Sequence, residues 1–184
     1  MIAGLLLYLS QALSYPYWVE PCTRPAATGC QSGDAELAAW ALEAWQNASG
    51  GHLTLIRASD PQKARIRLYW ADAQQGMYGE ARPILFEGKP GAEVYVRPAP
   101  LQSEGDRLLR DAIVFLTCVH ETGHALGLPH TANFDDIMYS FQFGGNIVEY
   151  FGRYRRKVDR RGDLRSASPL TARDRAHLLS ALKN

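Results

Sequence analysis

The stretch from His120 to His130 constrains this chain more than any other part of its sequence. It reads HETGHALGLPH. On an α-helix, residues four positions apart lie on the same face, so His120 and His124 can present their imidazoles to one metal ion. Gly127 can adopt the left-handed conformation that ends a helix, and Pro129 cannot continue one. The chain therefore turns back at this point, which can bring His130 to the same ion.

These three histidines predict a catalytic zinc site. Three imidazole ligands leave the fourth tetrahedral position open for water, as in catalytic rather than structural zinc sites. Glu121 follows the first histidine, where a carboxylate can reach metal-bound water without being a ligand itself. The alternative is a set of solvated helix histidines, which explains neither Gly127 nor His130.

The motif and its surroundings resemble a known group of proteins. A long zinc motif followed by a methionine turn, here at Met138, is the metzincin signature. Thr131 directly after the third histidine, and the short gap from His130 to Met138, are similar to the matrixin branch, the family of the matrix metalloproteinases. The resemblance is tight over residues 120–139, looser over 34–119 and poor over 140–169.

The resemblance implies a fold and an activity. The implied fold class is α+β, with a metzincin-like twisted mixed sheet, a core helix, a zinc-site helix and a C-terminal helix. The implied activity is that of a zinc-dependent endopeptidase, which hydrolyses peptide bonds of polypeptide substrates with a metal-activated water and Glu121 as general base. One catalytic Zn²⁺ ion would be held by His120, His124 and His130.

The same resemblance implies roles for the residues around the metal. Met138 would form an apolar floor under the ligands, and Tyr139 would wall the substrate pocket. Leu116, one helical turn before His120, matches the matrixin position that lines the pocket for the residue after the cleaved bond, so an apolar preference is implied there. Residues 81–86 would hold the peptide backbone by strand addition.

Matrix metalloproteinases bind a second zinc ion and calcium ions in the stretch before the zinc helix. No histidine lies between His52 and His120 in this chain, so a second zinc site is not predicted. A structural calcium ion is compatible with the family, but these residues do not indicate one.

The N-terminal residues favour export. An apolar run from Ile2 to Leu9 leads to Ala12-Leu13-Ser14, a small-x-small pattern typical of signal-peptidase sites. Residues 1–14 are therefore predicted to be a signal peptide, and residues 15–184 a single catalytic domain of a secreted protein. No Lys or Arg precedes the apolar run, which leaves open a buried N-terminal segment of the domain itself.

The cysteines fit an exported protein. Cys22 and Cys30 lie in a Pro/Thr/Gly-rich segment, and we predict a disulfide between them. The alternative is a cysteine that occupies the zinc, as in matrixin proenzymes, but the residues around Cys22 lack that motif. Cys118 lies two residues before His120, off the ligand face, and is predicted to be a small core residue.

Apolar periodicity predicts the main secondary structure elements. A helix that starts at Thr171 is further indicated by a capping-box pattern. Helices are expected over 34–48, 106–126 and from 171 onward, and strands over 53–58, 65–70 and 94–96, with a short apolar run at 84–86.

Two acidic and several basic residues leave alternatives open. Asp135 and Asp136 are interpreted as capping the methionine turn, or else as orienting a ligand histidine. Seven basic residues between Arg153 and Arg165 predict a solvated loop. The sharper hypothesis is that this stretch borders the specificity pocket and favours acidic substrates.

Composition limits the other functional classes. A chain of 184 residues with 46% hydrophobic content suits one domain, predicted to be a monomer. The net charge of +1 gives no reason to expect nucleic acid, and no window is long and apolar enough for stable membrane insertion. Two alternatives to an endopeptidase remain: a zinc-binding interaction or inhibitor module, and a hydrolase of small amides or esters.

Overall fold

Five strands form one sheet with the order β2-β1-β3-β5-β4. The computed structural model describes residues 12–72, 78–98 and 105–183. The strands are β1 (Leu13–Val19), β2 (Leu53–Arg57), β3 (Ile66–Trp70), β4 (Gly79–Phe86) and β5 (Lys89–Val96). Neighbouring strands run parallel except β4, which pairs antiparallel with β5 and forms an edge of the sheet.

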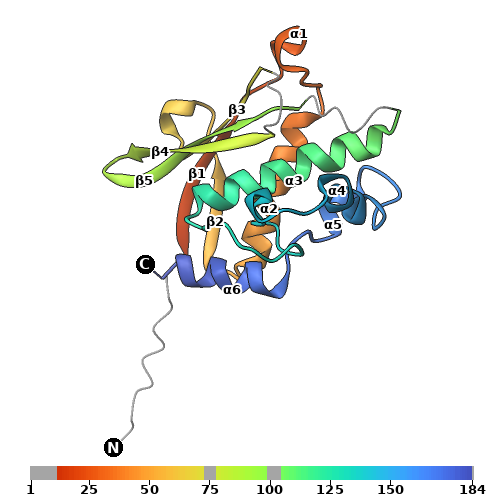
Figure 1. Cartoon of the computed structure of the whole chain (residues 1–184). Coiled ribbons are helices and arrows are strands. Elements are labelled where there is room, and N and C mark those ends of the chain that lie inside the picture. Colours follow the sequence, from red (N-terminus) through yellow and green to blue (C-terminus); the bar gives the residue numbers. More distant parts are fainter. Residues whose placement is uncertain (1–11, 73–77, 99–104, 184) are drawn as a thin grey trace, which may run out of the picture.

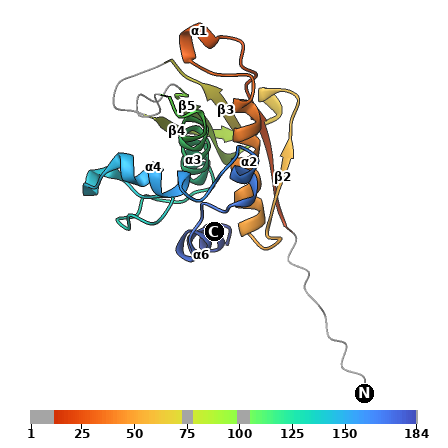
Figure 2. The same cartoon turned by 90° about the vertical axis from the view of Figure 1, so that its right-hand side faces the viewer.

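The longest helices pack beside this sheet. In Figure 1 the labels of β3, β4 and β5 lie above α3, and α4 lies below it. Figure 2 shows α3 nearly end-on, with α4 on one side of it and α2 and β2 on the other. The helices are α1 (Pro25–Thr28), α2 (Asp34–Ala48), α3 (Arg107–Ala125), α4 (Ile147–Arg155), α5 (Asp163–Ser166) and α6 (Ala172–Ala181), with 3₁₀ turns at Pro61–Lys63 and Phe141–Phe143. Among the described residues, no helix is long and apolar enough to cross a membrane.

Alternate residues of the central strands face the helices. Ile66, Leu68 and Trp70 of β3 and Val94 and Val96 of β5 are buried. This is the period of two that a strand with one buried face requires. The apolar face of the sheet therefore forms one wall of the core.

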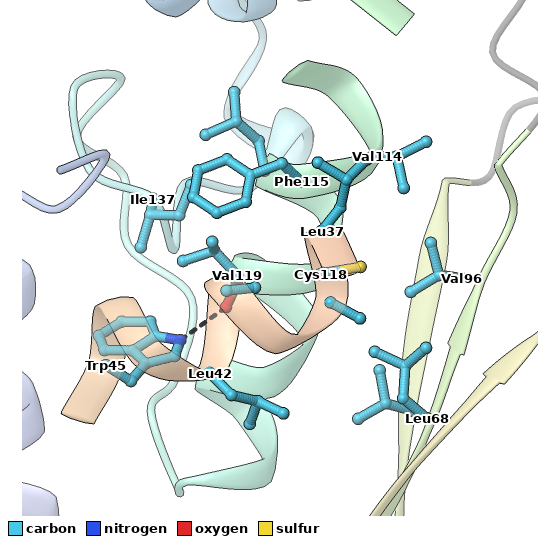
Figure 3. Packing of buried hydrophobic residues seen from close by; sticks show 14 of the residues in the cluster. Leu37, Leu42, Trp45, Leu68, Val96, Val114, Phe115, Cys118, Val119 and Ile137 are labelled. Carbon is cyan, nitrogen blue, oxygen red and sulfur yellow. Dashed lines mark hydrogen bonds between the residues drawn. The ribbon is translucent and has the colours of Figure 1, made fainter. Parts of the chain in front are cut away.

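Helix α2 packs against α3 in the core. Trp45 of α2 is fully buried, and its indole Nε1 donates to the carbonyl of Val119 in α3 at 2.9 Å. Figure 3 shows this bond, with Leu68 and Val96 of the sheet on one side and Ile137 on the other. Truncation of a buried Trp costs about 3–5 kcal/mol. The histidine-bearing helix is thus fixed by side chains from three parts of the chain.

The predicted fold class is confirmed. The structure combines a mixed sheet, a core helix α2, a long helix α3 with the histidines and a C-terminal helix α6. The capping box at Thr171 is present, because its side chain accepts from the Asp174 backbone while the Asp174 side chain accepts from Thr171. The disulfide between Cys22 and Cys30 is also confirmed, and Cys118 is buried.

The N-terminal prediction stays a prediction. Residues 1–11 lie outside the described residues, but Leu13 and Ser14 belong to β1 and pair with Leu53 and Thr54 of β2. Cleavage after Ser14 would remove the first two residues of that strand and leave the rest of its pairing in place.

Within residues 140–169, the prediction that the basic residues form a solvated loop is wrong. This stretch contains α4 and α5, and it buries Tyr150, Phe151, Tyr154 and Leu164. Its arginines form ion pairs, several of them with residues far away in the sequence, which the charge pattern alone does not show. The pairs are Arg153–Asp135, Arg155–Asp106, Arg156–Glu149, Arg160–Asp163, Arg161–Asp111, Arg161–Glu36 and Arg165–Glu43.

Candidate metal centre and active site

Helix α3 ends in the way that the glycine predicts. Gly127 has a φ of 91°, in the left-handed region. The Leu128 amide donates to Gly123 O at 3.0 Å, and the Gly127 amide donates to His124 O at 2.9 Å. These two bonds are those of the Schellman motif, which satisfies the last helical carbonyls. The chain leaves the helix sharply and returns along it to His130.

The three predicted ligands come together at this turn. Nε2 of His130 lies 3.2 Å from Nε2 of His120 and 3.1 Å from Nε2 of His124. Among the described residues, these histidines form a group whose ligand atoms all lie within 4.8 Å of one another. Two are half-buried and His130 is exposed, so the group opens to solvent on one side.

Backbone carbonyls fix the orientation of two imidazoles. Nδ1 of His120 lies 2.7 Å from the carbonyl of Ile137, and Nδ1 of His124 lies 2.8 Å from the carbonyl of Leu128. A carbonyl oxygen only accepts hydrogen bonds, so each Nδ1 is the donor. The Nε2 atoms of His120 and His124 therefore carry lone pairs and face the centre of the group.

The methionine turn is a closed loop beneath the histidines. The Thr131 amide donates to Met138 O at 2.8 Å, and the Ser140 amide donates to Thr131 O at 3.1 Å. Met138 is fully buried, and its sulfur packs against Gly123, where an added Cβ would meet Sδ at 2.4 Å. Met138 thus lies directly under the zinc-site helix, as an apolar floor would.

Within the described part of the chain, the Asp135 and Asp136 side chains contact residues other than the ligand histidines. Asp135 pairs with Arg153, and buried Asp136 accepts from the Thr171 hydroxyl at 2.9 Å. The side chain that caps the turn is Asn133, whose Oδ1 accepts from the Asp135 amide at 2.9 Å. Both interpretations of these aspartates are therefore wrong, because one tethers the turn to α6 and the other binds α4.

Glu121 is buried against the edge strand. The side chain is 7% exposed, and a Cβ added at Gly79 of β4 would lie 2.7 Å from its Cγ. Burial raises the pKa of Glu121, and the nearby Glu80 raises it further against the opposing effect of Arg97, to about 8. A divalent cation nearby favours the ionised carboxylate.

A cleft of about 310 Å³ runs over these groups. Its lining includes His120, Glu121 and His130 together with Leu116 and Tyr139, both predicted to line the substrate pocket. None of the basic residues between Arg153 and Arg165 is part of the lining. The structure therefore brings the predicted base, ligands and pocket residues to one place, and it leaves the basic stretch outside.

Comparison with known proteins agrees with this geometry. The sequence profile of the matrixin peptidase family matches residues 30–146. The chain belongs to the matrixin family. A similar solved structure is that of archaemetzincin from Methanopyrus kandleri, with 17% identity and a TM-score of 0.49, over 97% of this chain and 100% of that one. A search of curated proteins found no match. Family membership and the histidine group support a zinc metallopeptidase-like function.

The donor set of this matrixin fits zinc. A tetrahedral zinc ion with Zn–N distances of about 2.0–2.1 Å holds its ligand nitrogens roughly 3.3 Å apart. The separations of 3.1 and 3.2 Å between the Nε2 atoms are close to that value. Desolvation lowers the pKa of all three imidazoles, including that of the more exposed His130. All three are therefore neutral at pH 7, as metal ligands must be.

We expect the matrixin to keep its zinc in mildly acidic solution. Burial lowers the pKa of His120 from 6.5 to about 4. Protons and zinc compete for the same Nε2 atoms, so the metal content should stay nearly constant from pH 7 to about 5.5 and fall steeply toward pH 4. Equilibrium dialysis at each pH, followed by metal analysis, measures the zinc content per chain. A release midpoint near 6.5 would contradict the buried, neutral ligands.

The lowered pKa values of the three histidines also make the stability of the metal-free protein depend on pH. Histidines whose folded pKa is depressed contribute stability that is present above their unfolded value of about 6.5. That stability is lost as the pH falls through the folded values, which for His120 means toward pH 4. Thermal melts of the chelated protein should therefore show a melting temperature that declines below pH 6.5.

Gly79 is a further residue on which the position of Glu121 depends. An alanine Cβ there would lie 2.7 Å from Glu121 Cγ and 2.9 Å from Oε1, too close for any real contact. We expect Gly79→Ala to displace the carboxylate and to lower kcat by about 10²-fold, because a misplacement near 1 Å has that effect. Zinc content and melting temperature should change little. Gly162→Ala, at a position with open space and a φ of −63°, is the control.

Sequence reasoning missed several groups of this site. The carbonyls of Ile137 and Leu128 leave no trace in the side-chain pattern, because any residue supplies a carbonyl. The Asp174 carboxylate completes the capping box of α6, and it also accepts from the Ile137 amide at 3.0 Å. Tyr150 donates to the carbonyl of Ile137 at 3.1 Å and lies beyond the matched residues 30–146. No sequence signal identified Tyr150.

Proposed function

We propose that this matrixin is a zinc-dependent endopeptidase in which His120, His124 and His130 hold the metal and Glu121 is the general base. The convergence of three neutral imidazoles beside a buried carboxylate, in an open cleft, carries the proposal. When bound, zinc supplies Lewis acidity, which lowers the pKa of a water ligand and polarises a carbonyl group.

Glu121 is suited to move the protons of the reaction. Its carboxylate lies in the cleft wall. Because the side chain is buried, little water solvates the ionised carboxylate, which therefore stays a stronger base than an exposed one. A carboxylate with a raised pKa can accept a proton from the attacking water and then donate it to the leaving amine. One side chain can thus perform both transfers, and no second acid is required.

The edge strand β4 is suited to hold an extended peptide. The Tyr78 carbonyl accepts from the Arg97 amide. In an antiparallel pair, every second residue bonds to the partner strand, so this bond fixes which residues of β4 bond to β5 and which do not. By this alternation, the backbone groups of Gly79, Ala81 and Pro83 point away from β5. A peptide added at this edge would pair with them. Pro83 can only accept, since it has no amide proton, and an edge strand tolerates that.

Export of the enzyme is part of the proposal. The bond between Cys22 and Cys30 supports it, because disulfides persist in oxidising compartments and are rare in the cytosol. We propose that residues 1–14 direct secretion.

Digestion of an unbiased peptide library by the purified protein tests the activity, together with metal analysis. We expect internal cleavage, about one zinc per chain, and loss of cleavage on chelation with recovery on adding Zn²⁺. Hydrolysis of small esters or amides without peptide cleavage would instead indicate a small-substrate hydrolase. Zinc binding with no hydrolysis of either class would indicate a binding module.

A further inference from the structure

A second cavity lies behind the cleft. Its volume is about 180 Å³, and Leu116 and Tyr150 belong to the lining of both spaces. Leu116 comes from α3 and Tyr150 from α4. These two side chains therefore separate the cleft from the second cavity, and the two spaces differ in the charge of their lining residues.

The far side of this partition is basic. Arg153 and Lys157 line the second cavity, whereas the described residues that line the cleft include no Lys or Arg. The guanidinium carbon of Arg153 lies 4.5 Å from the centre of the Tyr150 ring. Its charge is partly balanced by Asp135 at 3.0 Å, whose side chain is 80% exposed. A side chain that passed the ring would meet a cation.

Hydrogen bonds and aromatic contacts hold Tyr150 in place. Its hydroxyl is within hydrogen-bond distance of the carbonyls of Asp136 at 3.2 Å and Ile137 at 3.1 Å. Its ring packs edge-on against Phe141 at 5.2 Å and Phe151 at 5.3 Å between centroids, and is 5% exposed overall. Moving the ring would break these contacts together, so it acts as a fixed wall and not as a gate.

We infer that the ring of Tyr150 sets the longest substrate side chain that the cleft accepts, and that it keeps the basic cavity behind it closed to substrate. This inference rests on the proposed peptidase function. The enzyme should cleave beside small and medium apolar side chains and discriminate against long or acidic ones. The basic stretch around Arg153 then has no effect on specificity while the ring is present.

Variants of Tyr150 test the wall. Tyr150→Phe keeps the ring and should leave the side-chain preference unchanged. Tyr150→Leu should raise relative kcat/KM by about tenfold or more for peptides with a long side chain after the cleaved bond. An extra methylene in an apolar pocket changes kcat/KM by this order of magnitude. An unchanged length preference in folded Tyr150→Leu would overturn the inference.

Phe151→Leu is the matched control. Phe151 is also an aromatic residue of α4, 5% exposed, but it lines only the cleft. Its replacement should enlarge the cleft without joining the two cavities, so acceptance of long side chains should not increase. An equal gain in Phe151→Leu and Tyr150→Leu would show that general loosening, not the wall, is responsible.

A third variant tests the charge behind the ring. Tyr150→Leu should gain cleavage beside glutamate as well as beside long apolar residues. Adding Arg153→Met together with Lys157→Met, which removes both cations that line the cavity, should remove the glutamate gain and retain the apolar one. No glutamate gain in the single variant would overturn the basic-cavity part of the inference.

A structural measurement separates this inference from the peptidase proposal. A crystal structure of Tyr150→Leu should show one continuous cavity that reaches Arg153, and this needs no catalysis. If the wild type cleaves no peptide, the proposed function fails, but this measurement still shows whether the Tyr150 ring separates the two cavities. Two cavities that remain separate, because neighbouring rings have filled the gap, would overturn it. If Tyr150→Leu fails to fold, Leu116→Ala opens the same partition from α3.

Discussion

Glu121→Gln should abolish peptide hydrolysis while the protein still folds and binds zinc. Glutamine has nearly the same shape as glutamate, but it cannot accept the proton that the general base must take. Removal of a general base lowers kcat by about 10²–10⁴-fold. The three histidines and their carbonyl partners do not involve the Glu121 carboxylate, so zinc content should remain at the wild-type value. Single-turnover cleavage with metal analysis of the same sample measures both.

The uncharged side chain should even stabilise the metal-free protein. Burial holds the pKa of Glu121 at about 8, so the unfolded chain ionises at lower pH than the folded one. Stability from the protonated form is present below the unfolded pKa of about 4.3 and is lost as pH rises through 8. Above neutral pH, chelated Glu121→Gln should melt higher than chelated wild type. Glu43→Gln, at a surface ion pair, is the control. Wild-type activity in Glu121→Gln would exclude the proposed base.

The metal centre was predictable because its information is local. His120, Glu121 and His124 lie on one helix, and the Schellman turn at Gly127 is a property of the next few residues. Helix geometry alone therefore brings most of the site together. The long helix was predicted over 106–126 and spans Arg107–Ala125, with Asp106 as its N-cap.

The surroundings of the site were not predictable, because they depend on contacts between distant residues. Glu121 packs against Gly79, and the Ile137 peptide is held by both Tyr150 and Asp174. Nothing in the pattern around these residues specifies which segment they will meet. The same limit explains the error over residues 140–169. A run of arginines looks solvated in one dimension, whereas Arg161 reaches Asp111 and Glu36 in the fold.

Arg110→Ala should destabilise the fold by about 3–5 kcal/mol, the cost of leaving a buried charge without its partner. Arg110 lies on α3 and pairs with Asp34 at the start of α2, where its Nη2 is 2.7 Å from Asp34 Oδ2. The two side chains are 9% and 1% exposed. The same guanidinium also donates to the carbonyl of Gly29 at 3.3 Å. Denaturant unfolding of the zinc-loaded protein measures the loss.

Two matched variants show why burial decides this effect. Arg160 pairs with Asp163 at 3.1 Å but is 86% exposed, so Arg160→Ala should cost about 0–1 kcal/mol. Arg110→Met combined with Asp34→Leu should recover much of the loss, since it removes both charges and leaves none unpaired. The pair joins the first turns of α2 and α3. A loss in Arg110→Ala no larger than in Arg160→Ala would therefore mean that apolar packing alone holds α2 against α3.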